Sequence, residues 1–342
     1  MRLLVAGGAG FIGSNYCRFV LREHPDDEIV ILDALTYAGR RSTVEDVLSS
    51  GRAKFEHGRI EDRTLVPSLS KKGRIDAIVN FAAETHNDRS LLGAEEFLAT
   101  NVLGVQALLD ACLEVGVQRM LHVSTDEVYG SIGSGKWTEE SPLMPNTPYS
   151  ASKAAGDLLC RAAFVTSRTP VIITRGGNTY GPYQYPEKLI PFFCTRLLMG
   201  KKAPLYGEGA QVREWIHVDD HCAAIDVALR EGTPGEVYNI ADANERQNRE
   251  VAAALLAALG ADESLIKRIP DPRKGAHDQR YSMDSSKIRA LGWSPRVPFE
   301  QGLVETAKWY REREDWWREI VESQEYRTFI SRFYGAALGE DL

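Results

Sequence analysis

The amino-acid sequence predicts an α/β fold built on a doubly wound parallel sheet, with a smaller lobe toward the C-terminus. Short apolar runs alternate with segments of helical period through the first half of the chain. Strands and helices that alternate in this way pair in parallel through right-handed crossovers. From Gly176 onward the alternation gives way to loops rich in Gly, Pro and Tyr, such as Tyr180–Pro186 and Pro204–Gly209.

The first expected strand, Arg2–Ala6, leads directly into Gly7-Gly-Ala-Gly-Phe-Ile-Gly13, ahead of an amphipathic helix at Ser14–Arg22. Such glycines allow a tight turn, let the backbone approach a pyrophosphate and place the phosphates at the helix N-terminus. The next strand, Ile29–Leu32, ends in Asp33, where a carboxylate binds both ribose hydroxyls of NAD and repels the extra phosphate of NADP. The segment therefore predicts a Rossmann-type NAD site.

The alternation continues beyond this site. Strands are expected at Ala77–Phe81, Met120–Ser124, Val171–Thr174 and Glu236–Ile240, and helices at Ala94–Val115, Tyr149–Arg168, Val218–Arg230, Arg249–Leu259 and Phe299–Arg313. We expect residues 1–180, with 214–242 returning to them, to form the NAD-binding Rossmann domain. Residues 181–213 and 243–335 are expected to form a smaller substrate-binding lobe.

Polar residues follow the strand at Met120–Ser124 and begin the next helix. Thr125, Asp126 and Glu127 are expected at the carboxyl end of the sheet, where α/β folds bind ligands. Tyr149 and Lys153 are four residues apart and share one helix face. A nearby cation favours a phenolate, which could accept a proton from a substrate hydroxyl. Tyr-x-x-x-Lys also arises by chance in helices, and acids suit the first turn of a helix.

Composition limits the possible functions. The chain has 342 residues and a net charge of −7, with no basic run suited to nucleic acid. No apolar run of membrane-spanning length is expected. The five cysteines are scattered without CxxC spacing, which indicates reduced thiols in a cytoplasm. His217 and His221 have the spacing of a metal pair but lack a nearby third ligand, so we expect a structural role and no metal.

The C-terminal part carries cationic groups and aromatic residues. Lys188, Arg213, Arg273 and His277 could bind phosphates, although each alone is more typical of a solvated surface. The aromatic cluster from Trp309 to Trp317 is expected to pack the last helix.

The chain resembles the extended short-chain dehydrogenase/reductase family and, within it, the dTDP-glucose 4,6-dehydratases, from Met1 to Trp317. The resemblance rests on Gly7–Ser14, Asp33–Gly39, Ala82–Ser90, Ser124–Gly130, Tyr149–Lys153, Pro186–Pro191 and Arg213-Glu-Trp215. The Thr-Asp-Glu triplet distinguishes dehydratases from relatives that usually lack the acid pair. The tail at 322–342 has no assigned role.

The resemblance implies an internal redox dehydration of a nucleotide hexose. Tyr149, with its pKa lowered by Lys153 and by the nicotinamide charge, would deprotonate the C4 hydroxyl, and Thr125 would bond the C4 oxygen. Glu127 would remove the C5 proton while Asp126 protonates the departing C6 hydroxyl. NAD takes a hydride from C4 and returns it to C6, which leaves a 4-keto-6-deoxy sugar.

The resemblance also implies binding residues and a homodimer. The residues expected to hold NAD are Gly7, Gly10, Phe11, Ile12, Gly13, Asp33, Leu35, Thr36, Ile60, Phe81, Ala82, Ala83, Thr100, Ser124, Tyr149 and Lys153. The residues expected to hold the nucleotide sugar are Thr85, Asn178, Glu187, Lys188, Leu189, Pro204, Tyr206, Arg213, Asn248, Arg273 and His277. The helices at Ala94–Val115 and Tyr149–Arg168 would pair across the homodimer.

The sequence departs from the family pattern at several positions. Arg59 replaces the usual Asp that grips the adenine amino group, and Asn87 replaces the usual Val. Gly176-Gly177-Asn178-Thr179 replaces Cys-Ser-Asn-Asn, and the segment Arg273–His277 is one residue longer, near Ala276. The base and exact hexose of the substrate therefore stay open.

Two alternatives remain at this point. One is a 4-epimerase, decarboxylase or dehydratase acting on a different nucleotide sugar. The other is a non-catalytic dinucleotide-sensing or scaffold protein, which would commonly lose Tyr149 or Lys153.

Overall fold

The computed structural model describes residues 1–273 and 277–339. The expected insertion at Ala276 and residues 340–342 of the tail lie outside these ranges. The central sheet has seven strands in the order β10-β6-β5-β4-β1-β2-β3, all paired in parallel. The predicted doubly wound Rossmann fold is therefore confirmed.

The strands of this sheet are short and mostly apolar. They are β1 Arg2–Ala6, β2 Glu28–Asp33, β3 Ala53–His57, β4 Ala77–Asn80, β5 Arg119–Thr125, β6 Val171–Gly176 and β10 Val237–Ile240. Val5 of β1 lies opposite Ile31 on one side and Val79 on the other. Because successive side chains of a strand point to opposite faces, Leu3 and Val5 join one core while Leu4 joins another.

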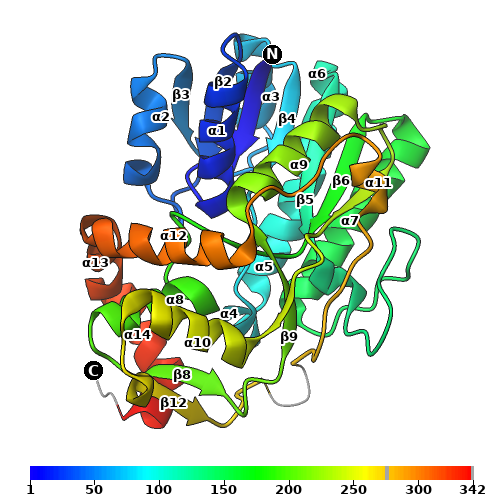
Figure 1. Cartoon of the computed structure of the whole chain (residues 1–342). Helices are drawn as coiled ribbons and strands as arrows, with labels where there is room; N and C mark the ends of the chain where they lie inside the picture. The colour runs from blue at the N-terminus through cyan, green and yellow to red at the C-terminus, as the bar shows by residue number, and fades with distance from the viewer. Residues whose placement is uncertain (274–276, 340–342) are drawn as a thin grey trace.

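Helices cover both faces of the sheet (Figure 1). One face carries α1 Phe11–Glu23, α2 Glu45–Ser49, α9 Val218–Glu231 and α11 Ser286–Arg289. The opposite face carries α3 Leu65–Gly73, α6 Val105–Val115 and α7 Pro148–Ser167. Both cores consist mainly of aliphatic residues from the strands and helices, joined by Tyr16 and Tyr238 in the first, so the sheet is buried on both sides.

The helix expected at Ala94–Val115 consists of α5 Glu95–Leu98, a π-helical turn at Ala99–Gly104 and α6. The whole segment Glu95–Val115 is long and apolar enough to cross a membrane, by length and composition alone. The expectation that no run reaches this length was therefore wrong. In the structure, Val105, Leu108 and Cys112 of this helix are buried in the core on the sheet.

A second, smaller lobe follows the sheet and occupies the lower part of Figure 1. Its elements are β7 Asn178–Tyr180, α8 Leu189–Leu198, β8 Ala203–Tyr206, β9 Val212–His217, β11 Glu245–Gln247, α10 Asn248–Leu259, β12 Ile266–Ile269 and α12 Phe299–Glu312. Strand β9 lies between β11 and β7, and β8 pairs with β12. Short α4, at Asn87–Leu92, lies between β4 and α5 in the chain and contacts α7.

The lobe contains one correction to the sequence analysis. The segment from Pro204 was expected to be a loop, but Ala203–Tyr206 is a strand with Pro204 opposite Lys267 of β12. A two-stranded sheet consists only of edge strands, where the missing N–H of proline is tolerated. The partner strand lies about sixty residues further along the chain, so no local pattern indicated the pairing.

The tail after α12 folds onto this lobe. It consists of α13 Glu314–Glu322, α14 Gln324–Ile330, a π-helical turn at Ser331–Gly335 and α15 Ala336–Leu338. Trp317, Tyr326, Phe329 and Tyr334 are buried in the core of the lobe. The expected packing role of the aromatic cluster is confirmed by Tyr310 and Trp317, which are fully buried there.

Candidate active site

A cavity of about 340 Å³ lies where the carboxyl ends of β1, β4, β5 and β6 face the smaller lobe. All predicted catalytic residues line it, namely Thr125, Asp126, Glu127, Tyr149 and Lys153. So do all predicted substrate-binding residues, namely Thr85, Asn178, Glu187, Lys188, Leu189, Pro204, Tyr206, Arg213, Asn248, Arg273 and His277. Residues distant in the sequence therefore meet around one space.

The predicted cofactor residues divide into two groups. Those that line the cavity are Gly7, Gly10, Phe11, Ile12, Gly13, Phe81, Ala83, Ser124, Tyr149 and Lys153. The others, which do not line it, are Asp33, Leu35, Thr36, Ile60, Ala82 and Thr100. Of these, Asp33 ends β2, and its two carboxylate oxygens accept the N–H groups of Ala9 (2.9 Å) and Leu35 (2.8 Å).

The glycine-rich turn fits a dinucleotide. A side chain at Gly7 would place its Cβ 2.5 Å from the nitrogen of Ala82, and one at Gly13 would lie 2.3 Å from the carbonyl oxygen of Gly7. Only glycine allows this close approach of strand and helix. Gly10 precedes α1 without a side-chain cap, so the first N–H groups of the helix can face a phosphate. The turn and the start of α1 therefore fit the pyrophosphate of a dinucleotide such as NAD.

The acid pair stands in a tight turn directly after β5. The Thr125 hydroxyl accepts the N–H of Glu127 at 3.3 Å and donates to Oδ1 of the Asp126 carboxyl group at 3.0 Å. Burial, reinforced by the charge of Glu127, raises the pKa of Asp126 to about 8. Asp126 is therefore protonated at neutral pH and can donate a proton, as a general acid must.

Tyr149 and Lys153 lie on the first two turns of α7. Burial and the carboxylate of Glu127 raise the pKa of the Tyr149 phenol above its usual value, partly offset by a hydrogen bond to Thr125. The lowering expected from Lys153 together with the nicotinamide charge stays a prediction. Burial lowers the pKa of Lys153 itself to about 8, and its ammonium donates to the carbonyl oxygen of Val123 at 2.7 Å. The Lys188 ammonium lies 5.8 Å from the centre of the Tyr149 ring.

The far end of the cavity is a network around the buried Asp88. This carboxylate accepts hydrogen bonds from Arg273 Nε at 2.6 Å and from the hydroxyls of Tyr206 and Tyr334, each at 3.2 Å. Although burial opposes it, Arg273 lowers the pKa of Asp88 to about 2. The network fixes Arg273, a predicted phosphate ligand, at the cavity wall.

The sequence analysis missed two members of this network. Asp88 lies within the motif Ala82–Ser90, which was therefore an available signal. Tyr334 lies in the tail and carried no local signal, because its hydroxyl meets Tyr206 at 2.7 Å only through tertiary packing.

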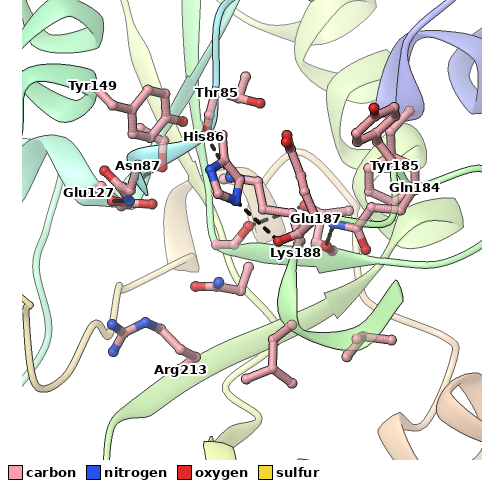
Figure 2. Close-up of a pocket in the computed structure, with 18 of the residues that line it drawn as sticks. Thr85, His86, Asn87, Glu127, Tyr149, Gln184, Tyr185, Glu187, Lys188 and Arg213 are labelled. Carbon is pink, nitrogen blue, oxygen red and sulfur yellow. Dashed lines mark hydrogen bonds between the residues drawn. The ribbon is translucent and has the colours of Figure 1, made fainter. Parts of the chain in front are cut away.

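Other predicted substrate residues are held by backbone or side-chain contacts, and Figure 2 shows Glu187, Lys188 and Arg213 among them around the pocket. Lys188 donates to the carbonyl oxygen of Thr85 at 2.5 Å. Arg213 donates to the carbonyl oxygen of Asp278 at 2.9 Å and stacks on the ring of Tyr281. The Glu187 carboxylate accepts from Arg89 at 2.9 Å and from Tyr37 at 2.8 Å. His277 bonds the Asp271 carboxylate at 2.5 Å.

The two histidines with metal-pair spacing have structural partners. His217 accepts the N–H of Asp219 at 3.3 Å, and His221 is hydrogen-bonded to the hydroxyl of Thr179 at 2.7 Å. Within residues 1–273 and 277–339, no cluster of three or more His, Cys, Asp and Glu could hold a metal ion. A Cβ at Gly176 would lie 2.5 Å from the His221 ring, so the replacement of the usual Cys by Gly makes room for this histidine.

Arg59, another departure, is about half exposed, and its guanidinium lies 3.7 Å from the carboxylates of Glu61 and Glu96.

Comparison with known proteins identifies close relatives. A family model described as GDP-mannose 4,6 dehydratase matches residues 4–306. The low-salt glycan biosynthesis protein Agl12 of Haloferax volcanii is 51% identical over 310 residues, covering 91% of this chain and 98% of that protein. A dTDP-glucose 4,6-dehydratase of Streptomyces niveus is 47% identical over 330 residues, covering 95% of this chain and 97% of that protein.

A solved structure agrees with these relatives. The dTDP-glucose 4,6-dehydratase DesIV from Streptomyces venezuelae, with NAD and dTDP bound, is 52% identical and superposes with a TM-score of 0.90. The match covers 94% of this chain and 100% of that one.

Proposed function

This chain belongs to the GDP-mannose 4,6-dehydratase family within the extended short-chain dehydrogenases/reductases, and on that premise we propose that it converts dTDP-glucose to dTDP-4-keto-6-deoxyglucose. It is an NAD-dependent hydro-lyase. The observation that carries the proposal is the pair Asp126–Glu127 beside Tyr149 in one cavity. A neutral acid next to a carboxylate is the arrangement that an elimination needs.

The chain's own residues supply the proton transfers. Tyr149 accepts the proton of the C4 hydroxyl, and Thr125 holds the C4 oxygen. Bound NAD supplies the hydride chemistry between C4 and C6 and a positive charge that favours the phenolate. Glu127 then takes the proton from C5, which the neighbouring C4 ketone has made acidic. Asp126 donates its proton to the C6 hydroxyl, which leaves as water.

The acid pair argues against the alternatives. A 4-epimerase shares the Tyr149 step but has no use for an acid and a base at C5 and C6. A protein that only senses a dinucleotide needs none of these groups. Asp126 is 3% exposed and its pKa is raised to about 8, a state that costs stability and is typical of functional sites.

The substrate residues follow the same proposal. Lys188, Arg213, Arg273 and His277 are the cationic or polar groups that would meet the diphosphate, and Arg273 is held for this by Asp88. Residues 1–180 with 214–242 would hold NAD, and residues 181–213 with 243–335 would hold the nucleotide sugar.

We also propose a homodimer that pairs α5–α6 with α7 of a second copy. Apolar side chains on these helices are exposed, among them Leu103 (61%), Leu158 (56%) and Val165 (54%). Such exposed side chains favour contact with a second protein surface. Analytical ultracentrifugation of the Leu103→Glu variant tests this, since a dimer built on these helices would dissociate.

A cytoplasmic location is proposed from five buried, unpaired cysteines, and cell fractionation tests it.

The decisive experiment uses dTDP-glucose carrying deuterium at C4. The proposed reaction moves the label to C6 of a dehydrated product, observable by NMR and mass spectrometry. Glu127→Gln should abolish dehydration while leaving oxidation at C4, whereas an epimerase would be almost unaffected. Unchanged dTDP-glucose alongside turnover of another nucleotide hexose would transfer the assignment to that substrate.

A further inference from the structure

Asn87, the first residue of α4, contacts the proposed C5 base directly. Its Nδ2 donates to Oε2 of Glu127 at 2.6 Å, the shortest contact that Asn87 makes. Figure 2 shows the two side chains together below the ring of Tyr149. Within the described part of the chain, no other side chain donates a hydrogen bond to the Glu127 carboxylate.

The other end of the Asn87 amide is anchored to the catalytic helix. Its Oδ1 accepts the hydroxyl of Thr147 at 2.7 Å. Thr147 is the N-cap of α7, where its hydroxyl oxygen also accepts the N–H of Ser150 at 3.1 Å. One residue thus connects Glu127 to the beginning of the helix that carries Tyr149.

These partners fix which way the amide points. The Thr147 oxygen already accepts from Ser150, so its proton is available for Oδ1 of Asn87. The Glu127 carboxylate, as an acceptor, then faces the NH₂ group. Asn87 is 7% exposed, and a buried amide with both ends bonded has little freedom to rotate.

We propose that Asn87 is a positioning residue that aims the Glu127 carboxylate at the C5 hydrogen of the sugar. The inference rests on the proposed dehydration. In that step the C5–H electron pair forms the C5=C6 double bond as the C6–O bond breaks. Glu127 takes the C5 proton, and Asp126 gives its proton to the leaving hydroxyl, so water departs and charge balances. Proton transfer requires the accepting oxygen near a hydrogen-bond distance from its target, so a carboxylate free to rotate transfers more slowly.

The family pattern that this sequence resembles has Val at this position. A valine side chain can make neither hydrogen bond, so Asn87 adds a constraint on Glu127 beyond the catalytic residues themselves.

The test is Asn87→Val, read through isotope effects on kcat. Loss of a hydrogen bond to a charged group predicts that kcat falls about tenfold. The fall should be confined to the C5 step. The kinetic isotope effect on kcat from deuterium at C5 should therefore increase. The isotope effect from deuterium at C4 should decrease toward one. Isotope effects are ratios within the folded, active molecules, so a partly unfolded preparation does not change them.

Ser150→Ala is the matched control, because it removes the reciprocal capping partner of Thr147 and leaves Asn87 in place. If the contacts among Asn87, Thr147 and Ser150 are purely structural, both variants should have a lower melting temperature, and both isotope effects should keep their wild-type values. That result for Asn87→Val, or an unchanged kcat, would overturn the inference. The unmodified enzyme is assayed first. If it does not dehydrate dTDP-glucose, the proposed function fails and the inference with it, whereas failure in Asn87→Val alone leaves the function standing.

Discussion

The two ends of the cavity are built in different ways. At the NAD end, the wall is backbone from one continuous turn, Gly7–Gly13, closed against Ala82. At the other end, the wall is side chains brought together from distant segments. Asp88 meets Arg273 across 185 positions and Tyr334 across 246. The NAD end forms because its glycines lack a Cβ atom. The other end forms only if every residue of the Asp88 network is present.

The two ends should therefore fail in different ways. An added atom damages a close-packed backbone turn, whereas a removed partner damages a buried charge network. A buried carboxylate that loses its cation costs about 3–5 kcal/mol, because its desolvation is no longer compensated. The catalytic residues lie at the junction and depend on both ends.

The largest effect is expected at this junction. Tyr149→Phe removes the proton acceptor for the C4 hydroxyl and should lower kcat by about 10³-fold, within the range of general-base catalysis. Binding at both ends should change far less than kcat, as measured by NAD content and by titration with dTDP, because the other residues that hold each ligand remain in place. Tyr183→Phe is the control, since Tyr183 contacts Arg313 outside the cavity. Residual activity within tenfold of wild type would contradict the assignment.

A second variant breaks only the backbone end. Gly13→Ala would place a Cβ 2.3 Å from the carbonyl oxygen of Gly7, so the turn must open. We expect NAD binding to weaken about a hundredfold, measured as NAD released from the purified protein, with dTDP binding retained. Gly93→Ala is the matched control, because this glycine has an extended φ of −178° and no atom within 4 Å of the added Cβ. Full NAD occupancy in Gly13→Ala would refute the close-approach argument.

A third prediction concerns pH and sharpens the role of the junction. The pKa of Asp126 is raised to about 8, so its proton is present below that pH and is lost above it. We expect kcat to fall about tenfold per pH unit above pH 8. Lys153 also has a pKa of about 8. Comparison with Asp126→Asn separates the two groups. That variant is slow, and any change of its kcat with pH above pH 8 should come from Lys153 alone. A constant wild-type kcat up to pH 9.5 would show that Asp126 is not the acid.

The smallest effect is expected at the side-chain end. Tyr334→Phe removes one hydroxyl from the Asp88 network but leaves Arg273 in place. The lost hydrogen bond is to an ionised carboxylate, but Asp88 keeps its bonds to Arg273 and Tyr206, so KM for the nucleotide sugar should rise only about fivefold with NAD binding unchanged. Tyr326→Phe, which alters a tail hydroxyl bonded to Pro186 outside the cavity, provides the comparison. A KM change of equal size in both variants would point to general loosening of the tail.

Local sequence was sufficient for most of the sheet. The expected strand Arg2–Ala6 has the predicted bounds, and β6 extends two residues beyond Thr174 to Gly176. Helix α1 begins at Phe11, earlier than the expected Ser14, because the glycine turn passes directly into the helix. These elements were predictable because apolar period and turn chemistry are properties of neighbouring residues.

The short strand Ala203–Tyr206 and the packed tail were not predictable in this way, because each depends on a partner far along the chain. The same holds for Tyr149. Its residue type and spacing indicated a base near Lys153, but its pKa depends on burial and on the distance to Glu127, which only the folded chain sets.

The sequence alone determined the parallel sheet, the glycine turn, and the identity of the acid pair and the Tyr–Lys pair, since each is written in adjacent or helically spaced residues. The tertiary structure decided which charges meet. It set the proton on Asp126, the Asp88–Arg273–Tyr334 network and the hold of Asn87 on Glu127. The physical reason is that electrostatic and hydrogen-bond energies depend on distance and burial, and for these groups both arise only when segments far apart in the chain pack together.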